Sequence, residues 1–226
     1  MYQVFVVRPT YSCKTLSFQP VSTSTKMFLD EVDRRLLMTL NDPEIRIALK
    51  EYLLRLPTKP QAILEELHVH KGNAIADVVA VYKEPHCYEI KGENDNITRI
   101  EKQGFFYNLV FNKITLVTTQ NHLNNALKKA PAHWGVIIVT HEDCKFKIKH
   151  HRKASSNPLF NKEKAIQTLW RQEMVSIIQE QELDISLKLN KTDLASNLAS
   201  LLNKGNIHTN VAKMLTARSF AKAQSH

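Results

Sequence analysis

Two acidic residues and a lysine lie close together in a part of the sequence that otherwise has the pattern of β-strands. Glu89 and Lys91 are two positions apart in the segment CYEIK, and Asp77 belongs to the strand-like segment before it. If the two segments form a hairpin that reverses at about Lys83, Asp77 stands directly opposite Glu89. Opposed side chains have Cβ atoms about 4.5–5.5 Å apart, and like charges there repel each other. A shared divalent cation turns that repulsion into coordination, and carboxylate oxygens suit Mg²⁺ or Mn²⁺.

Lys91 and one further acid extend this group. Lys91 shares the face of Glu89, about 6.7 Å farther along the strand, where its ammonium reaches a phosphate oxygen or a water. The preceding hairpin turns within HKGN, and a two-residue turn there brings Glu66 to the face of Asp77. A three-residue loop would bring Glu65 instead, but turn preferences favour the two-residue form. One face of the sheet is therefore predicted to present three carboxylates and a lysine.

The helix predicted after the third strand carries three polar side chains on one face. Arg99, Gln103 and Tyr107 follow one another at intervals of four residues, which places them close to a single helical face. If this face looks across the metal site, Gln103 and Tyr107 hold a substrate phosphate or a water, and Arg99 supplies positive charge to the scissile group. Ordinary exposure on a helix surface explains Arg99 equally well.

The surrounding elements decide whether these side chains can meet. Strand patterns cover residues 61–69, 75–82, 87–91, 113–119 and 134–140. Helix patterns cover two segments within 30–56, the second capped by Asp42, then a helix from Asp95 or Asn96 to about Phe111, and segments 124–130, 162–181, 192–203 and 208–220. The order α-β-β-β-α-β-α-β is typical of a central mixed sheet flanked by helices. The fold class is therefore predicted to be α/β with a C-terminal helical extension.

Charge is unevenly spread along the 226 residues. The net charge of +9 divides into +3 for residues 1–26, −2 for residues 27–144 and +8 for residues 145–226. We predict an N-terminal extension over 1–26, a core over 27–150 and a basic helical region over 151–226. A basic third suits a polyanionic partner such as nucleic acid. The segment 144–153, CKFKIKHHRK, fits either an edge strand protected by lysines or a rim that contacts phosphate.

The composition argues against membrane-spanning and secreted classes. No apolar run approaches the roughly 18–20 residues that span a bilayer, and the first residues lack the features of a signal peptide. The three cysteines are odd in number and far apart, without the spacing of a metal site. Reduced thiols and a cytoplasmic location are therefore expected, with no membrane partner.

The spacing of the polar residues resembles that of a known superfamily. Asp77, an eleven-residue gap, the run Glu89-Ile90-Lys91 and the QxxxY pair Gln103 and Tyr107 are similar to the PD-(D/E)XK nucleases. Over about residues 30–220, phrases such as IADVVAVY, CYEIKGENDNITRI and LWRQEM resemble a group of small bacterial and phage proteins within that superfamily. The resemblance implies a restriction-endonuclease-like core with metal-dependent phosphodiesterase activity.

The resemblance also implies roles for individual residues. Asp77, Glu89 and the backbone carbonyl of Ile90 match the metal ligands of the superfamily, and Lys91 matches its catalytic lysine. One departure is Ala76, which stands where the nominal motif has proline.

A second departure concerns an additional acid, which in this superfamily often lies on the first helix. Glu44 or Glu51 competes with Glu66 for that role.

These observations predict a nuclease that uses Mg²⁺ or Mn²⁺ to activate water against a phosphodiester bond, in DNA more readily than in RNA. Lys91 would orient the nucleophile or neutralise charge at phosphorus. Lys91→Ala is then expected to abolish cleavage while leaving folding intact. A homodimer would allow two sites to cut both strands. The alternative is a catalytically inactive protein that keeps the fold and binds nucleic acid or a protein partner.

Overall fold

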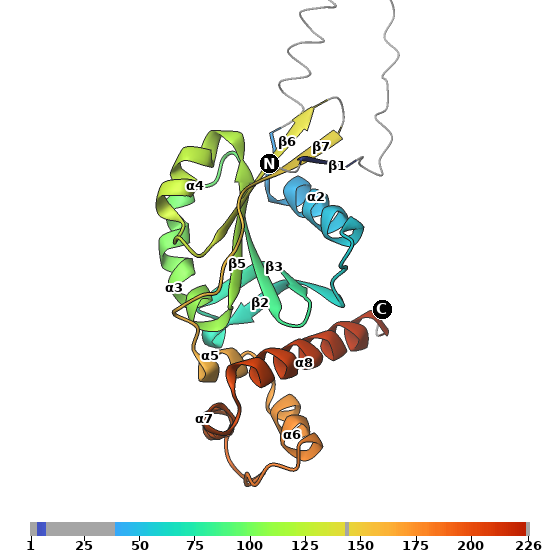
Figure 1. Ribbon diagram of the computed structural model, residues 1–226, viewed down its shortest axis with the longest axis vertical. Helices are drawn as coiled ribbons and strands as arrows, with labels where there is room; N and C mark the ends of the chain where they lie inside the picture. Colours follow the sequence, from blue (N-terminus) through green and yellow to red (C-terminus); the bar gives the residue numbers. More distant parts are fainter. Residues whose placement is uncertain (1–3, 8–38, 143–144, 225–226) are drawn as a thin grey trace, which may run out of the picture.

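A mixed seven-stranded β-sheet runs through the described part of the chain, residues 4–7, 39–142 and 145–224 of the computed structural model (Figure 1). Its strands are β1 (Val4–Val7), β2 (Ala62–Val69), β3 (Ala74–Val81), β4 (Pro85–Lys91), β5 (Lys113–Thr119), β6 (Gly135–Glu142) and β7 (Lys145–Arg152). They lie in the order β1-β7-β6-β5-β4-β3-β2. The three central strands β4, β5 and β6 are parallel, and all other pairs are antiparallel. The prediction of an α/β fold with a mixed sheet is confirmed.

Helices cover both faces of this sheet (Figure 1). They are α2 (Asp42–Arg55), α3 (Ile100–Val110), α4 (Leu123–Lys129), α5 (Lys162–Ile166), α6 (Arg171–Glu180), α7 (Lys191–Leu201) and α8 (Lys204–Gln224). Three short 3₁₀ turns are η1 (His70–Gly72), η2 (Ile97–Arg99) and η3 (Gln120–His122). From α2 to β6, helices and strands follow the predicted order.

Two hydrophobic cores form, one on each face, because successive side chains of a strand point to opposite sides. On β4, Tyr88 and Ile90 pack in the core shared with α2, whereas Cys87 packs in the core shared with α3 and the C-terminal helices. Glu89 alternates with Ile90 and therefore points toward α3.

Both predicted hairpins have the expected register. In the β3–β4 pair, Val78 lies opposite Tyr88 and Val81 opposite Pro85, so the chain reverses about Lys83. In the β2–β3 pair, even-numbered residues face odd-numbered ones, as a two-residue turn requires. That turn contains Lys71 and Gly72, both with positive φ (60° and 87°). Turns of this kind match the twist of the strands, and the glycine adopts its conformation without steric cost.

Three helix boundaries and the pairing of one strand differ from expectation. The cap of α2 is Asn41, which forms a capping box with Glu44, rather than Asp42. The predicted helix 162–181 is two helices, because the chain leaves helical geometry at Trp170, the N-cap of α6. The last helix begins earlier and ends later than 208–220. β7 is not an edge strand in the described sheet, because it pairs with β1 as well as with β6.

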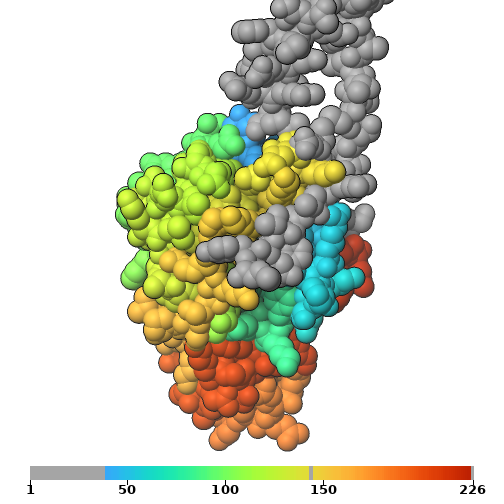
Figure 2. All heavy atoms as spheres, turned by 45° about the horizontal axis from the view of Figure 1, so that its top comes forward, coloured from blue at the N-terminus to red at the C-terminus, as the bar shows by residue number. Residues whose placement is uncertain are grey.

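The C-terminal helices gather at one end of the molecule, where α8 runs beside the β2–β3 hairpin (Figures 1 and 2). None of the helices in the described ranges is long and apolar enough to cross a membrane. The predicted N-terminal extension over 1–26 lies outside the described residues except for β1, and the predicted helix before Asn41 lies outside them as well.

Candidate active site

Asp77 and Glu89 lie next to each other at the point where the β3–β4 ladder ends. The last paired residues are Val78, which follows Asp77, and Tyr88, which precedes Glu89. Beyond them, Asp77 replaces a backbone acceptor with its side chain: the amide of Ile90 donates to Asp77 Oδ2 over 2.7 Å. This contact fixes the carboxylate of β3 against the backbone of β4, as the register predicted.

Glu89 is completely buried, with an exposed fraction of 0%, and both of its carboxylate oxygens are hydrogen-bonded. Lys91 Nζ lies 2.5 Å from Oε1, and the hydroxyl of Tyr107 lies 2.7 Å from Oε2. The same hydroxyl lies 2.6 Å from the carbonyl oxygen of Ile75. The hydroxyl has one proton, so it can donate fully to only one of these two oxygens, Glu89 Oε2 or the Ile75 carbonyl, at a time.

Burial perturbs the ionisation of this group. The pKa of Asp77 is raised to about 7, first because the carboxyl is removed from water and second because Glu89 lies nearby. Burial likewise raises the pKa of the Tyr107 hydroxyl, with the Glu89 charge acting in the same direction. When both carboxyls are ionised, they and the ammonium of Lys91 carry a net charge of −1, and the guanidinium of Arg46, 3.8 Å from Asp77 Oδ1, is already bidentate to Asp42. A cation beside the two carboxylates would favour their ionised forms.

The QxxxY pair lies on α3 as predicted, but Arg99 does not join it. Gln103 Nε2 lies 3.5 Å from the hydroxyl of Tyr107, and Gln103 Oε1 is buried without a hydrogen-bond partner among the described residues. Arg99 belongs to the 3₁₀ turn before α3, is exposed, and makes no side-chain hydrogen bond or ion pair with the described residues. The change from 3₁₀ to α-helical geometry between them breaks the assumed continuous helical face.

Glu66 lies apart from the pair of carboxylates, although the register of β2 is the predicted one. Its backbone has φ = 55°, and it is missing from the β2–β3 ladder between Glu65 and Leu67. A residue in the left-handed conformation interrupts the alternation of side chains along a strand. Whether Glu66 has an even or odd number therefore does not tell which face of the sheet its side chain is on. Among the described residues, no group of three or more Asp, Glu, His or Cys side chains is arranged to hold a metal ion. Glu66 is exposed and lines the cavity beside α8, which neither Asp77 nor Glu89 lines.

The alternative acids have other partners. Glu65 forms an ion pair of 2.5 Å with Lys50 of α2. Glu44 belongs to the capping box of α2, and Glu51 pairs with Arg55 at 3.3 Å.

Arg46 of α2 connects this periphery to the site and was not singled out from the sequence. Its guanidinium is bidentate to Asp42 at 2.8 and 2.9 Å, donates to the backbone carbonyl of Asp77 at 2.7 Å, and lies 3.8 Å from Asp77 Oδ1. Glu65 Oε2 is 3.6 Å away on another side. The i, i+4 pair of Asp42 and Arg46 is visible in the sequence, but its contact with β3 depends on how α2 packs on the sheet.

A close approach of two chain segments holds α2 beside the end of β4. A Cβ atom on Gly92 would lie 2.8 Å from Asn41 Cα, a distance that only glycine avoids. The amide of Glu93 donates to the carbonyl of Leu40 at 2.8 Å. On the other side, the hydroxyl of Thr118 in β5 donates to the carbonyl of Lys91 at 2.6 Å. The carboxylates are thus held from both flanking elements.

The donor set fits a Mg²⁺ or Mn²⁺ ion bound in the manner usual for phosphate chemistry. Mg²⁺ commonly takes one or two carboxylates and completes its shell with water and substrate phosphate. Asp77, Glu89 and the carbonyl of Ile90 would supply the oxygens of the protein, and Asp77 retains contact with solvent at a side-chain exposure of 21%.

The fold and this site define an α/β protein whose mixed sheet holds a buried glutamate–lysine pair beside a partly exposed aspartate, between its third and fourth strands. The chain belongs to the family of bacteriophage P4 protein cII, whose family model matches residues 37–225. It is similar to protein cII of Enterobacteria phage P4, with 24% identity over 169 residues that cover 74% of this chain and 64% of that protein. The chain thus spans less than two thirds of the length of that relative. No solved structure matches the chain.

Proposed function

We propose that the protein is a Mg²⁺- or Mn²⁺-dependent nuclease that hydrolyses phosphodiester bonds in DNA, on a core of the restriction-endonuclease type. The observation that carries this proposal is the partly buried contact of Asp77 with the Ile90 backbone beside the buried pair of Glu89 and Lys91. A buried ion pair is a weak source of stability, because the cost of desolvating two charges offsets their attraction. A binding or catalytic role is a better explanation for a second carboxylate next to it.

Each side chain of the group has a defined task in this proposal. Asp77 and Glu89 would hold the divalent ion, which when bound lowers the pKa of water and withdraws charge from phosphate. The ammonium of Lys91 lies at the Glu89 carboxylate, from which it would donate to a phosphate oxygen as charge develops there. Tyr107 fixes the orientation of Glu89 through its hydroxyl. The buried, unpaired Oε1 of Gln103 would accept a hydrogen bond from the attacking water.

The test is incubation with plasmid, linear duplex and single-stranded DNA in the presence of Mg²⁺, Mn²⁺ or EDTA. The proposal expects cleavage with either metal, none with EDTA, and cleavage by Glu89→Gln that is at least about a hundredfold slower with either metal. Cleavage that persists in EDTA, or that is unchanged in rate in Glu89→Gln, would reject the role of this group.

A second function is favoured by one specific observation. Both oxygens of Glu89 are already hydrogen-bonded within the chain, an arrangement that a protein without catalytic activity would also tolerate. Such a protein would bind nucleic acid through its basic C-terminal region alone. Binding that is equal in EDTA and in Mg²⁺, with no cleavage of any of the substrates, would support this function over the nuclease.

A further inference from the structure

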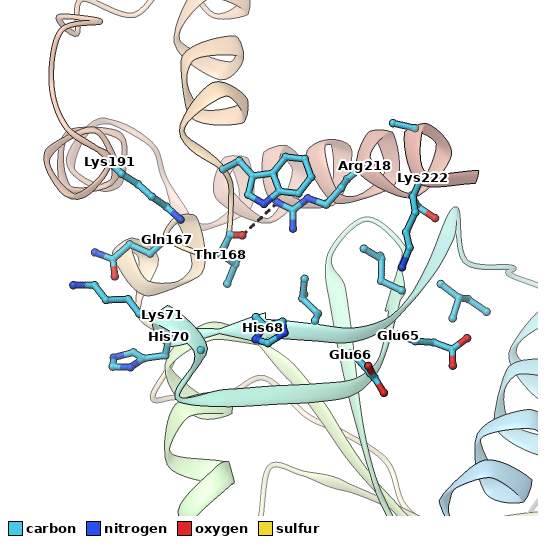
Figure 3. A pocket seen from close by; sticks show the side chains of 17 residues that line it. Glu65, Glu66, His68, His70, Lys71, Gln167, Thr168, Lys191, Arg218 and Lys222 are labelled. Atoms are coloured by element: carbon cyan, nitrogen blue, oxygen red, sulfur yellow. Dashed lines mark hydrogen bonds between the residues drawn. The ribbon is translucent and has the colours of Figure 1, made fainter. Parts of the chain in front are cut away.

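A cavity of about 930 Å³ separates the outer edge of β2 from the C-terminal helices (Figure 3). One wall is β2 itself, from Ile63 to the turn at Gly72, and the other is formed by α8 and the segment around Thr168. In the described sheet β2 is hydrogen-bonded to β3 alone. Its outer backbone groups therefore have no strand partner and face the side on which the cavity lies.

One end of the cavity collects positive charge. Lys71 comes from the β2–β3 turn, Lys191 from the first turn of α7 and Arg218 from α8, so three separate elements direct cations to one end (Figure 3). Glu173 balances Arg218 through contacts of 2.9 and 2.5 Å. Burial lowers the pKa of Lys191, and the charge of Arg218 lowers it further. An anion bound at this end would compensate the cations and reverse that effect.

An aromatic side chain stands beside these cations. Trp170 is 57% exposed although it lines the cavity, and the guanidinium of Arg218 lies 4.2 Å from the centre of its ring. Exposed aromatic rings next to cations are the usual platform on which the bases of a single strand stack while its phosphates contact the charges.

The opposite end of the cavity is connected to the candidate active site through one side chain, that of Arg46. Glu65 and Glu66 line this end (Figure 3). Arg46 lies 3.6 Å from Glu65 and 3.8 Å from Asp77, so a single side chain joins the wall of the cavity to the carboxylate pair. Lys222 of α8 lines this end beside the two acids, so the far end of the cavity carries charges of both signs (Figure 3).

We propose that this cavity binds single-stranded nucleic acid, with phosphates on Lys71 and Lys191 and a base on Trp170, and delivers the strand to Asp77 and Glu89. The inference rests on the proposed nuclease function and names its substrate class. The volume is that of a pocket for a ligand of drug size, which takes about one to a few nucleotides.

Binding is measured in EDTA, so that the result does not depend on cleavage. The chain has two tryptophans, and Trp134 is fully buried, so quenching of tryptophan fluorescence by a short oligothymidylate reports on Trp170. Trp170→Phe is expected to remove the quenching and to keep the affinity measured by anisotropy of a labelled oligonucleotide. Trp170→Ala is expected to weaken binding about tenfold. Absence of quenching in the unmodified protein would overturn the assignment of Trp170.

The charge contacts are tested by Lys71→Gln/Lys191→Gln against a matched control, Lys59→Gln/Lys128→Gln. The control lysines are exposed, do not line the cavity and make no ion pair with the described residues. The cavity variant is expected to bind at least tenfold more weakly at low salt and to lower the slope of log affinity against log salt by about 1–2. The control should change affinity less than threefold. Equal effects of the two variants, or no effect of either, would overturn the proposal.

The outcomes separate this inference from the nuclease proposal. Binding that depends on Lys71 and Lys191 without metal-dependent cleavage supports the cavity and refutes the nuclease. Cleavage that is equally fast for the cavity variant at low single-strand concentration refutes the cavity and leaves the nuclease standing.

Discussion

Two regions of the molecule differ in how their charges are balanced. One is the set of Asp77, Glu89 and Lys91 between β3 and β4, called the carboxylate group below, and the other is the cavity beneath α8. In the first, Glu89 is fully buried and Lys91 is 7% exposed, and partners from the same chain meet both oxygens of Glu89. In the second, Lys71 and Lys191 lie on the wall of an open cavity without an acid paired to either among the described ion pairs. Charges satisfied internally fix a geometry, whereas cations left to solvent are available to a ligand.

The largest expected effect breaks the buried pair. Lys91→Ala leaves the carboxylate of Glu89 in the core without its counterion, and removal of one partner of a buried ion pair typically costs about 3–5 kcal/mol of unfolding free energy. Lys191→Ala, which removes an exposed lysine of the cavity, is expected to change the free energy of unfolding by less than about 0.5 kcal/mol. Urea unfolding of both variants checks the contrast. From the sequence alone Lys91→Ala was expected to spare folding, and the burial of the pair now predicts otherwise.

A double variant shows whether the stability lost in Lys91→Ala comes from an unpaired charge or from lost packing. Glu89→Gln/Lys91→Met removes both charges together and is expected to recover most of the stability lost in Lys91→Ala, since no unpaired buried charge remains. A double variant as unstable as Lys91→Ala would show that packing, not charge, is responsible.

The next effect concerns cleavage. Glu89→Gln keeps the size of the side chain but removes a charged ligand from the proposed metal site, and a loss of about 10²- to 10³-fold in the turnover rate is expected. Lys71→Gln/Lys191→Gln should instead raise the KM for single-stranded DNA and leave the rate at saturation within about threefold. Initial rates over a range of substrate concentrations distinguish the two patterns. A Glu89→Gln protein with an unchanged rate would contradict the role of the carboxylate group.

The sequence predicted the geometry of the carboxylate group better than that of the cavity. The reason is that the residues of the carboxylate group are close together in the sequence, whereas the walls of the cavity are far apart in it. Asp77 and Glu89 are joined by one hairpin, whose turn residues and alternation set the register locally. The cavity depends on how α8 packs against β2 from more than 130 positions farther along the sequence. No local pattern contains that packing.

Three local features also escaped prediction. The left-handed backbone of Glu66 cannot be read from residue type, because glutamate rarely adopts it. The break before α6 falls at Trp170, within a stretch of helix-forming residues that contains no glycine or proline. Arg46 was visible only as a surface pair with Asp42, and its contact with Asp77 follows from the approach of α2 to Gly92.

The free energy of unfolding is expected to depend on pH through Asp77 in the carboxylate group. The pKa of Asp77 is about 7 in the folded chain and near 3.8 in the unfolded chain. Between these values the folded state binds more protons, so the free energy of unfolding falls as pH rises from about 4 to 7. With about 1.4 kcal/mol for each pKa unit, the loss is of the order of 2–4 kcal/mol. Asp77→Asn should remove most of this loss.

Added Mg²⁺ is expected to change the pH dependence of stability. A cation at Asp77 and Glu89 favours the ionised carboxyls, so Mg²⁺ should raise the melting temperature of the unmodified protein more at pH 8 than at pH 5. Asp77→Asn should show little response to Mg²⁺ at either pH. An identical Mg²⁺ response in both proteins would place the binding of the ion elsewhere in the chain.

The smallest expected effect tests Glu66, which the sequence placed in the carboxylate group and the structure places on the wall of the cavity. Glu66→Gln removes one negative charge that faces an incoming strand, so binding of oligothymidylate in EDTA should tighten by about two- to threefold at low salt and not at high salt. Metal-dependent cleavage at saturating substrate should change less than twofold, because Glu66 is exposed on the wall of the cavity, which neither Asp77 nor Glu89 lines. Glu65→Gln, which breaks the pair with Lys50, serves as the neighbouring control. A hundredfold loss of cleavage confined to Glu66→Gln would return this residue to the metal site and make the two regions one.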